Sequence, residues 1–131
     1  MKKTNTTILV FLLFFIGFFQ VNINFSLASE VRLENSFVCM MNNKFMGKEQ
    51  IPVEVGGKIY YGCCEGCKVT LRDDPSARVS LDPYTGKEVD KADAYIVKKP
   101  NGSDEVLYFE SEKTYENFLK EHTHVGDDAH V

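Results

Sequence analysis

Hydrophobic and polar positions alternate most clearly in two short runs that flank a pair of glycines. Residues 51–55 and 58–61 are rich in β-branched and aromatic side chains, and Gly56-Gly57 separates them. A two-residue glycine loop suits the twist of an antiparallel hairpin. The pattern therefore predicts a tight β-hairpin.

A short helix is expected after this hairpin. Cys67 and Leu71 share one face of it at helical spacing. The helix must end near residues 73–74, because Pro75 disfavours helical geometry in the residue before it.

The second half of the chain follows the same plan. A turn-rich stretch at 81–87 precedes two expected strands at 94–98 and 105–109, with a turn at 100–103 between them. Ser111 is a plausible N-cap for a helix that runs to about residue 121, with Tyr115 and Phe118 on its apolar face.

Aligning the halves matches Cys39 with Thr85, Cys63 with Glu110 and Cys67 with Thr114. We read this as a duplication of one strand-strand-helix unit whose second copy lacks thiols. The alternative is that any two small hairpin-helix segments align this well.

The expected fold class is α+β, built from two small treble-clef-like units, each a β-hairpin followed by a short helix. The first unit spans 29–79 and the degenerate repeat spans 80–121. Residues 122–131 contain all three histidines, show no apolar periodicity and are expected to form a disordered tail.

The N-terminus has the order of a secretory signal peptide. Lys2 and Lys3 precede an apolar run at 8–19, and small residues lead up to Ala28 and Ser29. We expect cleavage after residue 28 and export to the periplasm or the extracellular space. An uncleaved anchor is the alternative, although the run is shorter than the roughly 20 residues of a spanning helix.

Removing residues 1–28 takes away two lysines and leaves 13 basic against 19 acidic residues. This acidic balance argues against binding to nucleic acid or to anionic membranes. The remaining apolar content is modest, and small exported units of this size commonly need a metal or disulfide staple.

The four cysteines supply such a staple. Cys63 and Cys67 are four positions apart at the expected helix start, where the helix dipole favours thiolate, and Cys39 would add a third sulfur from upstream. Cys64 points about 100° away from Cys63 on a regular helix. If the helix starts later, Cys64 would replace Cys63 and pair with Cys67.

Three thiolates suit Cu(I), whereas structural Zn(II) prefers four ligands. Met40 is one of three nearby methionines that would add a thioether, and its other interpretation is a gap-filling core residue. His122 and His124 would complete a zinc site, or they are simply part of a solvated end.

Two alternatives to metal binding stay open. An exported chain with an even number of cysteines commonly forms disulfides, and a redox-active thiol pair would make the chain a thiol oxidoreductase.

The run from Tyr60 to Lys68, preceded by Cys39, resembles the TRASH and YHS group of small metal-binding domains. Their signature is a cysteine, about twenty residues, then C-x-x-x-C after an aromatic strand. The resemblance implies a treble-clef-like fold with Cys39, Cys63 and Cys67 as ligands, in proteins linked to heavy-metal sensing, trafficking and resistance, copper prominent among them. The spacing between Cys39 and Cys63 is slightly long for the group, and the second copy lacks its thiols.

We therefore expect an exported protein that captures a soft ion, Cu(I) or Zn(II), for metal homeostasis, with a metal transporter or another envelope protein as partner and no stable membrane span after cleavage. The alternative is an extracytoplasmic interaction module in which zinc or a disulfide is only structural. We do not expect an enzyme, because no histidine lies near a cysteine in the expected units and no Ser/His/Asp set or phosphate-binding glycine loop occurs.

Overall fold

A computed structural model describes residues 32–123 of the chain. The expected signal peptide at 1–28 and His124 lie outside the described residues.

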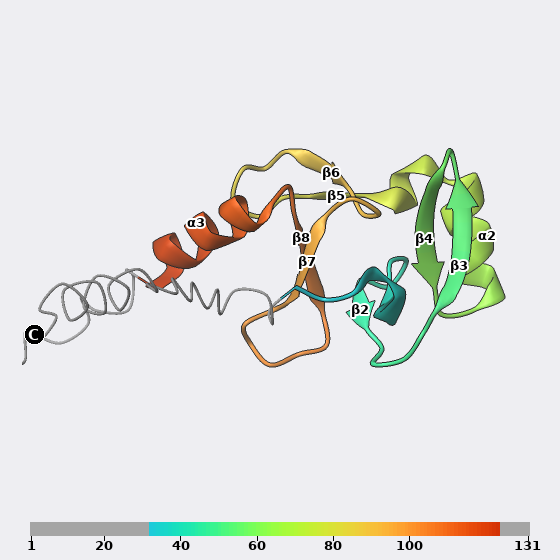
Figure 1. Ribbon diagram of the computed structural model, residues 1–131, viewed down its shortest axis with the longest axis horizontal. Helices are drawn as coiled ribbons and strands as arrows, with labels where there is room; N and C mark the ends of the chain where they lie inside the picture. Colours follow the sequence, from blue (N-terminus) through green and yellow to red (C-terminus); the bar gives the residue numbers. More distant parts are fainter. Residues whose placement is uncertain (1–31, 124–131) are drawn as a thin grey trace, which may run out of the picture.

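The described chain is a small α+β protein of antiparallel hairpins and two α-helices, so the expected fold class is confirmed (Figure 1). Each strand pairs with one neighbour, in the pairs β1–β2, β3–β4, β5–β6 and β7–β8. The elements in chain order are η3 (Asn35–Phe37), β1 (Val38–Cys39), β2 (Lys44–Phe45), β3 (Ile51–Val55), β4 (Lys58–Gly62), α2 (Glu65–Asp73), η4 (Pro75–Arg78), β5 (Val79–Leu81), β6 (Glu88–Asp90), β7 (Tyr95–Lys98), β8 (Val106–Phe109) and α3 (Glu112–Thr123).

The same order of elements occurs twice: a short hairpin, a longer hairpin, then a helix. The predicted β3–β4 hairpin closes on the pair Val55 and Lys58, and Gly56 and Gly57 have the positive φ angles of 59° and 78° that this turn requires. The sequence analysis did not predict the short hairpins β1–β2 and β5–β6. Strands of two or three residues are too short to show an alternating pattern.

Both halves contribute to one hydrophobic core. Met40 and Leu71 from the first half pack with Ile96 and Tyr108 from the second, and all four side chains are fully or almost fully buried. The expected boundary between residues 79 and 80 falls inside β5. The two units therefore share a packed interior.

Backbone hydrogen bonds also join the halves. The N–H of Phe45 donates to Asp104 at 2.7 Å, and the N–H of Val106 donates to Asn43 at 3.0 Å. These bonds attach the β1–β2 hairpin to the β7–β8 hairpin and thereby connect the two units.

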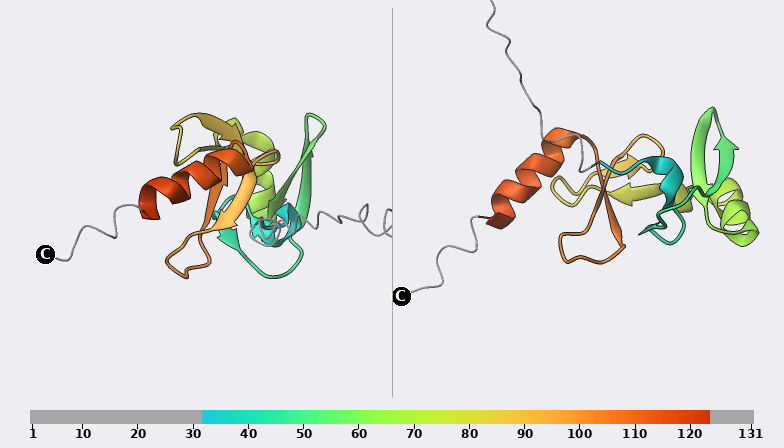
Figure 2. Two further views of the ribbon diagram at one scale, coloured as in Figure 1. Left: turned by 60° about the vertical axis from the view of Figure 1, so that its left-hand side comes forward. Right: turned by 60° about the horizontal axis from the view of Figure 1, so that its bottom comes forward.

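Helix α3 packs on a second, smaller cluster around Phe109. The ring of Phe109 contacts Tyr115 and Phe118 edge-on, at centroid distances of 5.2 and 5.3 Å. Helices α2 and α3 lie at opposite ends of the described structure, as Figure 1 and the right-hand view of Figure 2 show. Helix α3 ends at Thr123, so His122 is helical and the expected tail starts later than residue 122.

Candidate metal centre

The centre forms where strand β4 turns into helix α2. A Cβ atom on Gly62 would lie 3.0 Å from Cys67 Cβ and 3.2 Å from the backbone nitrogen of Lys68. Any larger residue here would force the strand end and the first turn of the helix to move apart by a few tenths of an ångström. This contact brings Cys63, the next residue, beside Cys67.

Cys39 reaches the same place from the end of β1. The N–H of Met40 donates to the carbonyl of Tyr61 at 2.8 Å, which fixes β1 against β4. The sulfur atoms of Cys39, Cys63 and Cys67 then all lie within 4.8 Å of one another, and Cys63 Sγ is 3.6 Å from Cys67 Sγ. A soft metal ion can be held by three sulfurs that converge in this way.

The structure corrects the reason for this convergence. Helix α2 starts at Glu65, so Cys63 precedes the helix and does not share a helical face with Cys67. Cys64 is the N-cap, and its sulfur accepts the backbone N–H of Cys67 at 3.5 Å. Cys64 Sγ also lies 3.4 Å from Cys67 Sγ, so the 100° rotation expected between Cys63 and Cys64 does not apply.

The local environment favours a thiolate at Cys39. Burial by itself raises the pKa of Cys39, but hydrogen bonds from the backbone of Asn42, from the Cys63 thiol and from the backbones of Cys63 and Met41 outweigh it. The pKa of Cys39 therefore lies below its ordinary value, and thiolate is the form that binds metal.

The pKa values of the other sulfurs shift in both directions. A backbone hydrogen bond from Cys67 lowers the pKa of Cys64. The pKa of Cys63 is raised, chiefly because its thiol donates to Cys39, and burial raises the pKa of Cys67 to about 12. Metal binding must displace the protons that Cys63 and Cys67 hold.

Two polar residues near the sulfurs were missed by the sequence analysis. Lys91 is buried and donates to the carbonyls of Met40 at 2.8 Å and Ala77 at 3.0 Å. Burial lowers the pKa of Lys91, and its electrostatic interaction with Cys39 opposes this shift. Asn42 Nδ2 donates to Cys63 Sγ at 3.4 Å. Their positions depend on tertiary contacts, and the local sequence carries no signal for them.

Two of the additional candidate ligands, Met40 and His122, make packing contacts instead. Met40 is fully buried within the hydrophobic core, which fits its interpretation as a packing residue. His122 stacks on Phe118 at 4.1 Å and its Nδ1 contacts the Phe118 carbonyl at 2.8 Å, on the helix at the opposite end from α2. Among residues 32–123, Cys39, Cys63 and Cys67 form the only group of three Cys, His, Asp or Glu side chains close enough to share an ion.

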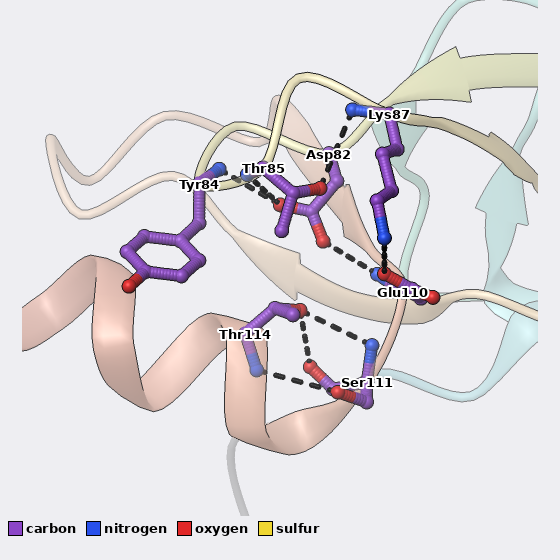
Figure 3. A network of polar contacts seen from close by, with 7 residues as sticks. All are labelled: Asp82, Tyr84, Thr85, Lys87, Glu110, Ser111 and Thr114. Atoms are coloured by element: carbon purple, nitrogen blue, oxygen red, sulfur yellow. Dashed lines mark hydrogen bonds and ion pairs between the residues drawn. The ribbon is translucent and has the colours of Figure 1, made fainter.

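In the second unit a carboxylate occupies the corresponding place (Figure 3). Asp82 is 1% exposed and accepts the backbone N–H groups of Tyr84 at 2.7 Å, Thr85 at 3.1 Å and Glu110 at 2.8 Å. Burial raises the pKa of Asp82, but these bonds and one from Thr114 outweigh it and hold the pKa below its ordinary value.

The donors around Asp82 match those around Cys39. Each acceptor is bound by the N–H groups two and three positions later and by the N–H of the residue that follows the long hairpin, which is Cys63 in one unit and Glu110 in the other. The structure therefore pairs Cys39 with Asp82, and the predicted match with Thr85 was wrong by three positions.

The helix starts match as well. Ser111 Oγ accepts the N–H of Thr114 at 3.3 Å, as the Cys64 sulfur accepts the N–H of Cys67. Ser111 was the predicted N-cap. The second unit thus closes the same turn with oxygen acceptors, where the first unit uses sulfur.

Comparison with family models, curated proteins and solved structures finds no match to this chain. In the part of the chain that the structure describes, neither helix is long and apolar enough to cross a membrane.

Proposed function

We propose that this chain is an exported metal-binding protein that captures a soft ion, Cu(I) or Zn(II), through Cys39, Cys63 and Cys67 in metal homeostasis, trafficking or resistance. The observation that carries the proposal is the approach of these three sulfurs to within 4.8 Å of one another from separate elements. The proposed role of the protein is metal binding and not catalysis.

The nature of the ligands supports a soft ion. Among residues 32–123 no carboxylate or imidazole joins the three cysteines. Three thiolates favour Cu(I), for which trigonal sulfur coordination is common. Zinc would require a fourth ligand, and Cys64 is the nearest further sulfur, 3.4 Å from Cys67.

The resemblance to the TRASH and YHS group, carried by the run from Tyr60 to Lys68 and by Cys39, points to the same activity. The signal-like N-terminus supports an extracytoplasmic location, where a metal transporter or another envelope protein would be the partner.

The test is metal content after purification under reducing conditions. The wild-type chain should carry one equivalent of Cu(I) or Zn(II), and the double variant Cys63→Ser, Cys67→Ser should carry none. Val69→Ala is a suitable control, because Val69 lies on the same helix as Cys67 and its side chain is exposed. Full metal content in the double variant would contradict the assignment.

A further inference from the structure

The four sulfurs form a series from the interior to the surface. Cys39 is fully buried, Cys63 and Cys67 are partly buried, and Cys64 is exposed. Cys67 Sγ connects this series, because Cys63 Sγ lies 3.6 Å from it and Cys64 Sγ lies 3.4 Å from it. The sulfur cluster thus has a buried member, Cys39, and an exposed member, Cys64.

We propose that Cys64 is the exchange ligand of this centre, through which a thiophilic ion such as Cu(I) enters and leaves the three-sulfur site. This inference rests on the proposed function and adds a route for the ion to the site that holds it.

The position of Cys64 suits a temporary ligand. As N-cap, its sulfur accepts the long N–H bond from Cys67, at 3.5 Å, and contacts the Cys67 sulfur at 3.4 Å, while its side chain is exposed. A neutral N–H to sulfur contact of this length is weak, so the sulfur can turn to an incoming ion at little cost. A donor molecule can reach this sulfur without opening the core around Cys39.

The transfer requires no change of oxidation state. Copper stays Cu(I) throughout, and it exchanges a bond to the incoming donor for a bond to Cys64, then adds Cys67. Each thiol releases its proton to water when its sulfur binds the ion, and Cys64 takes a proton up again when Cys39 completes the site and Cys64 dissociates. At every stage at least two ligand atoms hold the ion, first those of the donor together with Cys64 and then the protein sulfurs, which avoids a high-energy bare ion.

A permanent fourth ligand is the competing role for Cys64. A permanent ligand contributes to equilibrium affinity, whereas an exchange ligand that is free in both end states changes only rates. Removal of the Cys64 sulfur therefore lowers the equilibrium affinity if Cys64 is a permanent ligand, and lowers only the transfer rates if it is an exchange ligand.

The experiment compares wild-type protein with Cys64→Ser. Serine is a strong N-cap, so this variant keeps the start of α2 and removes only the soft donor. Each protein is mixed under reducing conditions with the Cu(I)–bicinchoninate complex, and loss of the coloured complex is followed by stopped flow. The reverse transfer is started by adding excess bicinchoninate to the loaded protein.

We expect Cys64→Ser to slow loading and unloading by a similar factor, about tenfold or more, with an unchanged equilibrium affinity. Unchanged rates would overturn the exchange role, and a lower affinity with an unchanged loading rate would identify Cys64 as a permanent ligand. If the wild-type chain takes no copper from the complex, the proposed function itself fails, and this result is distinct from both.

Discussion

The carboxylate of Asp82 accepts the backbone N–H of Glu110 at 2.8 Å across 28 residues of sequence. This bond joins the β5–β6 turn to the start of α3, in the way that Cys39 and Cys63 join the corresponding parts of the first unit. Three N–H groups converge on one buried carboxylate, so the second unit closes its turn without a metal ligand.

Asp82→Asn should destabilise the protein by about 2–3 kcal/mol, because hydrogen bonds to a charged acceptor are stronger than those to an amide and the new NH₂ group meets backbone donors. The free energy of unfolding from urea titrations measures this. Asp104→Asn is a matched control, since Asp104 is an exposed partner of Lys98 and should cost less than about 1 kcal/mol. An equal loss of unfolding free energy in both variants would show that Asp82 does not stabilise the turn.

The stability supplied by Asp82 should depend on pH. Its folded-state pKa lies below the ordinary value. Its contribution is therefore present above the unfolded pKa of about 3.9 and is lost as pH falls through the lower folded pKa. The difference in unfolding free energy between wild type and Asp82→Asn should shrink when measured from about pH 6 towards pH 2.5. A constant difference across this range would contradict a charged Asp82.

Gly62→Ala should weaken metal binding and destabilise the fold. The added Cβ would meet Cys67 Cβ at 3.0 Å and a backbone nitrogen at 3.2 Å, so the strand end and the helix must separate. Overpacking of this kind typically costs about 1–3 kcal/mol. Competition with a chelator measures the affinity, and urea unfolding measures the stability.

Gly66→Ala is the control for this experiment. A Cβ on Gly66 would meet only Cys64 Sγ, at 3.8 Å, and alanine is the better helix former by about 1 kcal/mol. This variant should retain its stability or gain some. If Gly62→Ala behaves in the same way as Gly66→Ala, close passage at Gly62 is not needed for the site.

Removal of the metal should leave the protein folded at a lower unfolding midpoint. The core formed by Met40, Leu71, Ile96 and Tyr108 includes no candidate ligand cysteine, and the second unit is closed by Asp82. Loss of a bound ion removes only its linkage contribution to stability. Circular dichroism before and after chelation tests this, and unfolding on chelation would favour the alternative in which the metal is structural.

The sequence predicted the long elements well. The β3–β4 hairpin and helix α3 rest on local signals: a glycine pair between β-prone runs, and an apolar helical face after the Ser111 cap. The short strands β1, β2, β5 and β6 carry no comparable pattern, because pairing with neighbours defines them.

The three sulfurs were identified correctly as a group, but for an incomplete reason. The sequence suggested a shared helical face for Cys63 and Cys67, whereas the close passage at Gly62 brings them together. The roles of Asp82 and Lys91 depend on contacts 28 and 51 residues away, and no local pattern indicates such contacts.

The paired turns around Cys39 and Asp82 give this protein an internal reference. In an amide NMR spectrum, the signals of Met41 and Asn42 report on the sulfur-bound turn, while those of Tyr84 and Thr85 report on the same geometry built on oxygen. A ligand that acts on sulfur alone would move the first pair and leave the second in place. A general change of fold would move both pairs of signals. One spectrum of the protein therefore distinguishes metal coordination from a conformational change.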